Sequence, residues 1–173
     1  MAEAYEAARV GLRPATAKDH WLIRQWLGEP HVEAWWGNRA SAEAEISLAL
    51  ASCSAICRMI EVGGVAIGYA HAVDTGLWGG ALPADLPSGT WDADLFVGTA
   101  SHRGRGIGAS ALRLLKDEVF TTTLAVGLCL FVSVRNEHAV RAFERAGFRW
   151  QRIWNNPAKG PCWILFAERP ARR

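Results

Sequence analysis

The most informative segment of the chain reads Arg103-Gly104-Arg105-Gly106-Ile107-Gly108. It stands between an alternating apolar stretch, 91–97, and a stretch whose apolar residues have helical spacing, 106–120. Closely spaced glycines let backbone N–H groups approach an anion, the N-terminus of a helix adds its positive end, and the two arginines add charge. The segment therefore predicts a pyrophosphate-binding turn between a strand and a helix.

Two common nucleotide-binding patterns do not fit this turn. A Walker loop needs Gly-Lys-Ser/Thr to hold the γ-phosphate and magnesium, and no such sequence follows here. A dinucleotide fingerprint belongs to the first strand–helix unit of its domain, whereas this turn comes after residue 100. The residues themselves therefore predict a pyrophosphate group and neither of these two nucleotide sites.

The remaining patterns predict a mixed α/β domain with its ligand site at the strand-to-helix junction after Val97. Strands are expected at 10–13, 54–62, 65–73, 91–97, 128–134, 148–154 and 162–167. Helices are expected at 16–27, with Trp21, Leu22, Trp26 and Leu27 inside, and at 31–36, 41–51 (capped by Ser41), 106–120 and 136–146. The segment 74–90 is rich in glycine and proline and carries Trp78, which predicts a functional loop.

Composition limits the class of protein. The chain has 173 residues, of which 50% are hydrophobic and 21% charged, as expected for one globular domain. It contains no apolar stretch of the roughly 18 residues that a membrane span needs, and its first residues lack the apolar core of a secretory signal. Its four cysteines form no CxxC pair, which predicts buried, reduced thiols in a cytoplasmic protein and excludes a structural zinc site on spacing.

The net charge of +2 conceals an uneven distribution. Residues 1–100 hold 6 basic and 12 acidic side chains, a net charge of −6, whereas residues 101–173 hold 13 and 5, a net charge of +8. One part therefore suits a cation and the other an anion, which favours an enzyme with two small substrates over a nucleic-acid-binding protein. Nine tryptophans add rings that can pack the core or stack on sugars and cations.

A second segment specifies the family. It reads Asn136-x-x-Ala139-x-x-x-Phe143-Glu144-x-x-Gly147-Phe148 and begins 33 residues after Arg103. Together with Arg103-x-x-Gly106-x-Gly108, it resembles the two coenzyme A-binding motifs of the GNAT N-acyltransferase superfamily. The resemblance covers 1–173 as a single domain. It implies an α/β fold with a central, mostly antiparallel sheet of six to seven strands, splayed between strands four and five and flanked by helices.

The same resemblance implies acetyl-CoA as co-substrate and assigns the residues that bind it. Backbone N–H groups from Gly104 to Ala109 would hold the pyrophosphate. The Phe96-Val97-Gly98 backbone would pair with the pantetheine arm like an added strand, Asn136 would hydrogen-bond the same arm, and a strand-four N–H would serve as oxyanion donor. The implied coenzyme A-binding residues are Phe96, Val97, Gly98, Arg103, Gly104, Arg105, Gly106, Ile107, Gly108, Ala109, Asn136 and Phe143. No metal is implied.

Three shorter segments resemble one group within the superfamily, the aminoglycoside 6′-N-acetyltransferases and the related siderophore N-acyltransferases. They are Trp26-Leu27-x-x-Pro30-His31-Val32-x-x-Trp35-Trp36-Gly37, Ile67-Gly68-Tyr69-Ala70-His71 and Asp94-Leu95-Phe96-Val97-Gly98. In that group the aspartate of the third segment is the candidate base beside the acetyl group. The resemblance thus implies acetyl transfer to a primary amine, with the 6′-amine of an aminoglycoside as the leading acceptor.

The residues support an acceptor that is a cation. Asp92 and Asp94 share one face of their strand, and two acids on a mostly buried strand are costly unless they meet a cation or hydrogen-bond donors. A bound ammonium must lose a proton before it attacks the thioester, and Asp94 is the expected base for direct attack in a ternary complex. The substrate-binding candidates are Trp36, His71, Trp78, Asp92 and Asp94. Further acids expected around the acyl gap are Glu29, Glu33, Asp74 and Asp85.

One residue departs from the family pattern. Many GNAT enzymes have a tyrosine where this chain has Phe143, and that tyrosine protonates the leaving thiolate. In this chain either water or another donor must supply the proton, or the thiolate leaves without one, as its pKa allows near neutrality. Siderophore N-acyltransferase, peptide N-acetyltransferase and a non-catalytic coenzyme A-binding sensor remain alternative functions. The expected partners are a small amine and acetyl-CoA, without nucleic acid or membrane, for a monomer or a homodimer.

Overall fold

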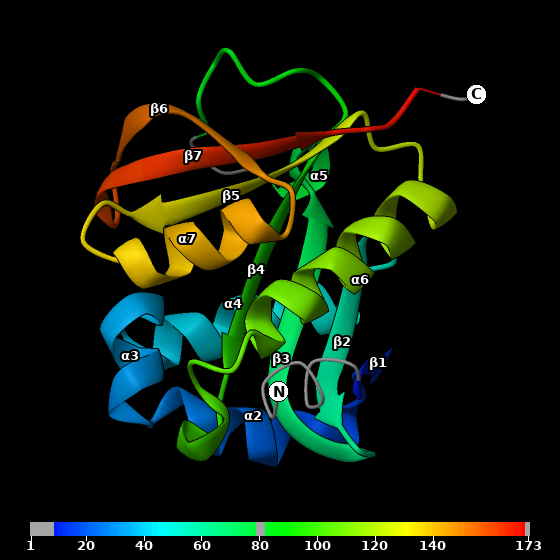
Figure 1. The fold of residues 1–173 in the computed structure, drawn as a ribbon, viewed down its shortest axis with the longest axis vertical. Coiled ribbons are helices and arrows are strands. Elements are labelled where there is room, and N and C mark those ends of the chain that lie inside the picture. Colours follow the sequence, from blue (N-terminus) through cyan, green and yellow to red (C-terminus); the bar gives the residue numbers. More distant parts are fainter. Residues whose placement is uncertain (1–8, 79–81, 172–173) are drawn as a thin grey trace.

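The computed structural model describes residues 9–78 and 82–171, apart from the side chains of Leu77 and Trp78. Within these ranges seven strands form a single sheet (Figure 1). The strands are β1 (Val10–Pro14), β2 (Ala55–Val62), β3 (Val65–Asp74), β4 (Thr90–Val97), β5 (Gly127–Ser133), β6 (Arg149–Asn156) and β7 (Gly160–Glu168). The helices are η1 (Ala17–Asp19), α2 (His20–Leu27), α3 (Pro30–Trp36), α4 (Arg39–Ala51), α5 (Thr75–Trp78), η2 (Ala100–His102), α6 (Ile107–Thr122) and α7 (Glu137–Arg145).

The sheet has the order β1-β2-β3-β4-β5-β7-β6 and is antiparallel except between β4 and β5. The parallel pair is short, because only Thr90–Asp92 pairs with Gly127–Cys129. Beyond this point β5 stays paired with β7 to Ser133 while β4 runs away from it, as Figure 1 shows. This confirms the mixed, mostly antiparallel sheet that is splayed between its fourth and fifth strands.

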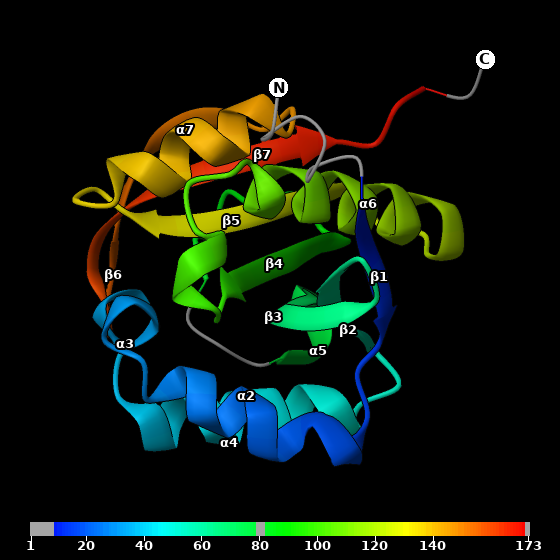
Figure 2. The same cartoon turned by 60° about the horizontal axis from the view of Figure 1, so that its bottom comes forward.

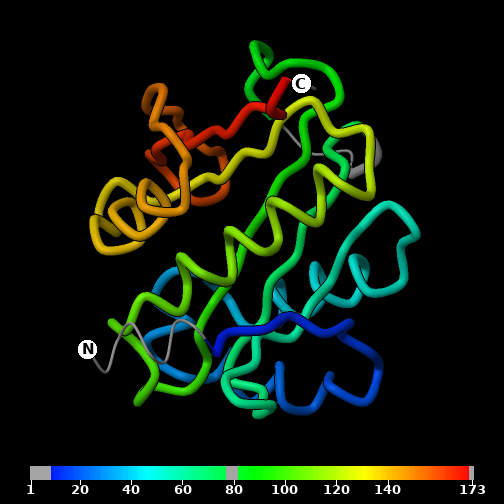
Figure 3. The backbone as a smooth tube through the Cα atoms, turned by 45° about the vertical axis from the view of Figure 1, so that its right-hand side comes forward, coloured from blue at the N-terminus to red at the C-terminus, as the bar shows by residue number. Residues whose placement is uncertain are grey.

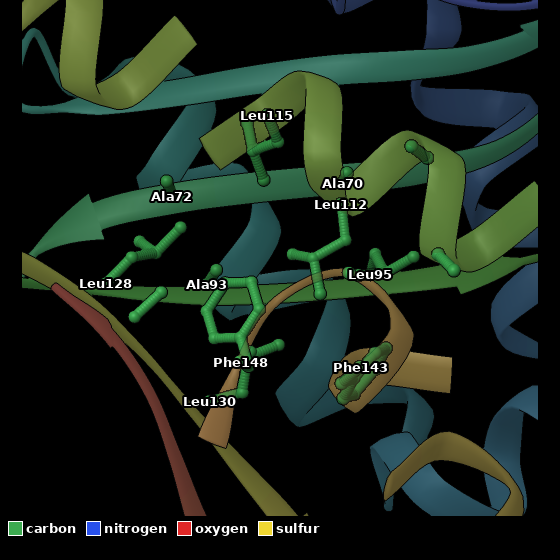
Figure 4. Packing of buried hydrophobic residues seen from close by; sticks show 14 of the residues in the cluster. Ala70, Ala72, Ala93, Leu95, Leu112, Leu115, Leu128, Leu130, Phe143 and Phe148 are labelled. Carbon is green, nitrogen blue, oxygen red and sulfur yellow. The ribbon is translucent and has the colours of Figure 1, made fainter. Parts of the chain in front are cut away.

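Helices cover both faces of the sheet. In Figure 2, α2 and α4 lie below it and α6 and α7 above it, and Figure 3 shows α6 running across the strands as a long diagonal. Below the sheet, Ile23 and Ile46 pack with Tyr69 and Phe96. Above it, α6 presents a buried apolar stripe to a second core that includes the residues labelled in Figure 4, among them Leu112. The gap between β4 and β5 therefore opens in a sheet that is otherwise held on both faces.

The predicted elements are confirmed with two corrections near the N-terminus. The fourth helix begins at Arg39 and not after Ser41, because Asn38 caps it by accepting hydrogen bonds from the N–H groups of Ala40 (2.9 Å) and Ser41 (3.2 Å). The capping box at Thr16–Asp19 is present, but it closes a 3₁₀ turn that precedes α2. The buried side of α2 therefore comprises Ile23, Trp26 and Leu27, whereas Trp21 is exposed and its predicted burial is wrong.

The cysteines and the loop require smaller corrections. Cys57, Cys129 and Cys162 are buried and reduced as predicted, whereas Cys53 is exposed at the end of α4. The segment 74–90 contains a short helix, α5, and is fastened to β4 by the Thr75 hydroxyl, which donates to the Thr90 carbonyl at 2.6 Å. None of the helices in the described ranges has the length and apolarity needed to cross a membrane.

Candidate active site

The gap between β4 and β5 opens into a cavity of about 950 Å³. Its walls come from α3, the middle of β4, the turn before α6, the end of β5, the start of α7 and the turn between β6 and β7. These segments lie far apart in the sequence, and it is the divergence of the two strands that lets them face one space. The cavity is therefore at the strand-to-helix junction that the sequence predicts as the ligand site.

The turn before α6 forms one end of the cavity and has the backbone of an anion site. Gly104 and Gly106 have φ values of 72° and 74°, in the left-handed region that favours glycine. The first helical hydrogen bond of α6 runs from the Ser110 N–H to the Gly106 carbonyl at 3.1 Å, so the N–H groups of the preceding turn point out of the helix end. Arg103 lines the cavity beside them, whereas Arg105 is exposed and lies outside the lining.

The edge of β4 that faces the gap presents the backbone of Leu95 and Val97. Trp36 Nε1 donates to the Leu95 carbonyl at 3.4 Å, and His31 Nε2 lies 2.9 Å from the Val97 carbonyl. The Gly98 N–H points the other way and donates to the Ile67 carbonyl of β3 at 2.8 Å. Of the three predicted pantetheine-pairing residues, the structure therefore directs the Val97 backbone, and not the Gly98 N–H, toward the gap.

Gly98 has a packing role that explains why glycine stands there. A Cβ atom at this position would lie 2.1 Å from Cγ of Trp26, so only glycine lets the end of β4 pass this ring. The side chain of Phe96 also has a packing role, because it is buried and lies edge-on against the rings of Trp26 and Trp36. The two residues thus hold β4 against the helices below the sheet.

The start of α7 forms the wall opposite β4. Asn136 caps this helix, since its Oδ1 accepts from the Ala139 N–H at 3.2 Å, and it lines the cavity at the same time. Phe143, about two helical turns after Asn136, also lines the cavity. Its ring is buried in the core above the sheet (Figure 4). A phenyl ring offers no proton, so the structure places no hydroxyl at this position.

Asp94 supplies the carboxyl group on the β4 side of the cavity. It is half-buried on β4, lines the cavity, and its Oδ1 accepts from the Leu95 N–H at 2.8 Å. Burial raises the pKa of Asp94 to about 7, with a further increase from the Glu45 carboxylate, while the Lys159 ammonium and the Leu95 N–H act in the opposite direction. A carboxyl with this pKa exchanges protons readily near neutral pH.

Asp92 and His71 stand beside Asp94 but outside the cavity lining. Burial raises the pKa of Asp92 well above its usual range, and the charges of Asp94 and Glu45 add to the effect. His71 is buried, accepts or donates at Nδ1 to the Tyr69 hydroxyl at 3.2 Å, and packs against the Trp36 ring at 5.8 Å. Burial lowers the pKa of His71 to about 4, so the ring is neutral at pH 7. Both residues support the strands behind the cavity.

The structure separates the other predicted acceptor residues. Trp36 is buried and its neighbour Trp35 is more exposed, and both residues line the cavity. The side chain of Trp78 lies outside the part of the chain that the structure describes. The other acids expected around the gap are elsewhere: Asp85 forms an ion pair with Arg152, and the Asp74 carboxylate accepts from the Gly76 N–H.

Three residues of the site were not assigned from the sequence. His31 lies in a quoted motif, Glu45 lies within the predicted helix 41–51, and Lys159 belongs to the turn after β6. Each comes from a different segment, and their relation to Asp94 arises only when the sheet is assembled. Among the residues that the structure describes, no group of His, Cys, Asp and Glu side chains could hold a metal ion.

Comparison with known proteins now identifies the family. A model of the acetyltransferase (GNAT) domain matches residues 15–155. The aminoglycoside N(6′)-acetyltransferase type 1 of Klebsiella pneumoniae is 28% identical over 170 residues, which cover 94% of this chain and 84% of the relative. The protein of the same name from Serratia marcescens matches equally.

Solved structures agree with this result. AAC(6′)-Ib in complex with paromomycin and acetyl-CoA has a TM-score of 0.80 and 27% identity, and the match covers 92% of this chain and 93% of that one. The same TM-score and identity are found for AAC(6′)-Ib in complex with coenzyme A and kanamycin, over 92% of this chain and 95% of that one. The splayed sheet, the glycine turn and these matches lead to one conclusion. The chain belongs to the GNAT family of N-acetyltransferases, enzymes that take acetyl-CoA as co-substrate.

Proposed function

We propose that this protein transfers the acetyl group of acetyl-CoA to the 6′-amine of an aminoglycoside, with Asp94 as the base. The observation that carries the proposal is the position of Asp94, whose carboxyl faces the same cavity as the anion-binding turn before α6 and has a pKa of about 7. The relatives at 28% identity are aminoglycoside N(6′)-acetyltransferases, which supports the acceptor class.

The turn before α6 suits the pyrophosphate of coenzyme A. The N–H groups from Gly104 to Ala109 converge there with the positive end of the helix, and Arg103 supplies a charge that can pair with a phosphate oxygen. A Cβ atom on Gly104 or Gly106 would meet nothing within 4 Å, so glycine is needed for the left-handed backbone and not for space. The site is therefore built from backbone geometry more than from side chains.

The edge of β4 suits the pantetheine arm. Leu95 and Val97 present their backbone groups to the gap that β5 leaves, so an extended arm can occupy the place of the missing strand. Asn136 uses Oδ1 for its helix cap, and its Nδ2 can donate to the arm from the opposite wall. The Leu95 N–H, now bonded to the Asp94 carboxylate, is the proposed donor to the thioester carbonyl oxygen.

Asp94 then serves the acceptor amine. An ammonium group bound in the cavity transfers one proton to the Asp94 carboxylate, and the neutral amine forms the new C–N bond while the C–S bond to coenzyme A breaks. Because acetyl-CoA is already an activated donor, no covalent enzyme intermediate is required. Cys129 is buried in the middle of β5, which agrees with a structural role for that thiol.

The test of the proposed function is release of coenzyme A thiol from acetyl-CoA in the presence of a panel of acceptors. The panel contains aminoglycosides with and without a free 6′-amine, hydroxylysine-type siderophore precursors and short peptides. Turnover confined to aminoglycosides with the 6′-amine is the expected result. Turnover of another amine would show that the assignment of an aminoglycoside as acceptor is wrong. Binding of coenzyme A without any turnover would favour the alternative function, a non-catalytic coenzyme A-binding sensor.

A further inference from the structure

The turn between β6 and β7 holds a lysine in a fixed position. Asn156 Oδ1 accepts from the N–H groups of Ala158 (2.8 Å) and Lys159 (3.1 Å), and Gly160 follows with φ of 78°. The strands on either side pair from Asn156 with Gly160 onward, so the turn is closed at its base. The backbone of Lys159 is therefore anchored by a hydrogen-bonded turn.

This lysine is exposed and lines the same cavity as Asp94. Lys159 and its neighbours Ala158, Pro161 and Cys162 line the same cavity as Asp94, although Lys159 comes from the β5–β7–β6 part of the sheet and Asp94 from β4. The divergence of the two parts thus brings a cation from one and a carboxylate from the other to a single space.

The electrostatics agree with this geometry. Desolvation acts to lower the pKa of Lys159, but the carboxylates of Asp94, Glu45 and Asp92 together raise it above its usual value, so the ammonium is charged at neutral pH. In return, this charge acts to lower the pKa of Asp94. The remaining titratable groups near it are His71, which is neutral at pH 7, and Cys162, whose thiol pKa burial raises. Among these groups, Lys159 alone supplies a positive charge.

We propose that Lys159 is a specificity-determining residue that admits one ammonium of the acceptor to Asp94 and disfavours a second ammonium beside it. The inference rests on the proposed function, because it concerns the acceptor at that same site. The carboxylate of Asp94, with that of Glu45 nearby, attracts an amine to this part of the cavity, and the Lys159 ammonium offsets part of their negative charge. A second cation close to the reacting amine therefore meets repulsion from Lys159.

This predicts discrimination between two aminoglycosides that differ in one group. Kanamycin A has a hydroxyl at the 2′ position of the ring that bears the 6′-amine, and kanamycin B has an amine there. The wild-type protein should show a higher kcat/KM for kanamycin A. Lys159→Met should reduce this preference by about fivefold, because it removes one positive charge from the cavity that holds Asp94. Lys159→Arg, which keeps the charge, should retain the preference.

A second readout follows from the coupling of Lys159 to Asp94. Lys159→Met removes a charge that lowers the pKa of Asp94, so the acid limb of the kcat/KM profile should move to higher pH. Lys18→Met, which removes one positive charge from an exposed site on η1, is the control and should change neither readout. The proposal would be overturned if Lys159→Met kept both the wild-type preference for kanamycin A over kanamycin B and the wild-type pH of the acid limb of kcat/KM.

The design separates this proposal from the proposed function. If the wild-type protein acetylates neither kanamycin, the aminoglycoside assignment fails. The same comparison is then made with a monoamine and a diamine from whichever acceptor class is turned over. A smaller ratio of kcat/KM for the monoamine to kcat/KM for the diamine in Lys159→Met than in the wild type would still support the role of Lys159. An unchanged ratio would refute it.

Discussion

The two walls of the cavity are built in different ways. The coenzyme wall, defined as Gly104–Ala109 with Asn136, consists of consecutive backbone N–H groups and a helix cap. The acceptor wall, defined as Asp94 and Lys159, consists of side chains from β4 and the β6–β7 turn, and the Glu45 carboxylate of α4 acts on both through its charge. A wall made from local backbone geometry is recognisable as a motif, whereas a wall made from distant side chains exists only in the folded protein. The coenzyme wall is therefore the easier of the two to predict from the sequence.

The largest effect is expected from Gly106→Val in the coenzyme wall. A β-branched residue is strongly disfavoured at φ of 74°, so the backbone must rotate and its N–H groups must leave their common direction. Because several charge-assisted hydrogen bonds are lost together, we expect affinity for coenzyme A to fall by at least about 100-fold. Isothermal titration calorimetry with coenzyme A measures the change.

Gly11→Val is the matched control for that substitution. Gly11 lies on β1, its Cβ would meet nothing within 4 Å, and its φ is not positive. It should bind coenzyme A like the wild type. Wild-type affinity in a folded Gly106→Val protein would show that the glycine turn does not hold the pyrophosphate.

The next effect is expected at Asp94 in the acceptor wall. Asp94→Asn removes the proposed base, so kcat should fall by at least about tenfold while affinity for acetyl-CoA stays within about twofold. In the wild type, kcat/KM should decrease as pH falls below about 7, because protonated Asp94 cannot accept the proton of the ammonium. The substitution should abolish this limb. Asp117→Asn, on the exposed face of α6, is the control.

Asp94 also predicts a change in stability whose sign is opposite to that of activity. Its pKa is higher in the folded than in the unfolded protein, so the folded state binds the proton preferentially and stability decreases as pH rises from about 4 through 7. Asp94→Asn removes this penalty and should have the higher melting temperature at pH 8. Normal turnover in Asp94→Asn would remove this residue from the mechanism.

A smaller effect is expected at Glu45, which acts on Asp94 from α4 through its charge. Its carboxylate raises the pKa of Asp94, so Glu45→Gln should move the acid limb to lower pH. We expect kcat/KM to rise about two- to threefold at pH 6 and to stay unchanged at pH 8. Glu43→Gln is the control, because that side chain turns to His20 and Arg24. An equal response of the two variants would contradict the assignment.

The same difference between the walls explains how much the sequence predicts. The glycine turn, the helix predicted at 136–146 and the splayed sheet are confirmed, because each depends on neighbouring residues or on the order of elements. The roles of Glu45 and Lys159 depend on their electrostatic influence on Asp94, from which they lie 49 and 65 residues away in the sequence, and no local pattern encodes such a relation. The direction of the Gly98 N–H was also not predictable, because it depends on the register of β4 against β3.

The smallest effect is expected from Phe143→Tyr, which restores the hydroxyl that many family members have in the coenzyme wall. If the thiolate of coenzyme A leaves without a proton donor, as its pKa allows near neutrality, kcat at pH 7 should change by no more than about twofold. Since Phe143 lines the cavity, the new hydroxyl can reach solvent and the melting temperature should change little. Phe148→Tyr, in the closed core, should lower the melting temperature more, because its hydroxyl is buried without a partner. A tenfold increase in kcat for Phe143→Tyr would instead show that protonation of the thiolate limits turnover. The coenzyme wall would then bind coenzyme A but lack the proton donor that its departure requires.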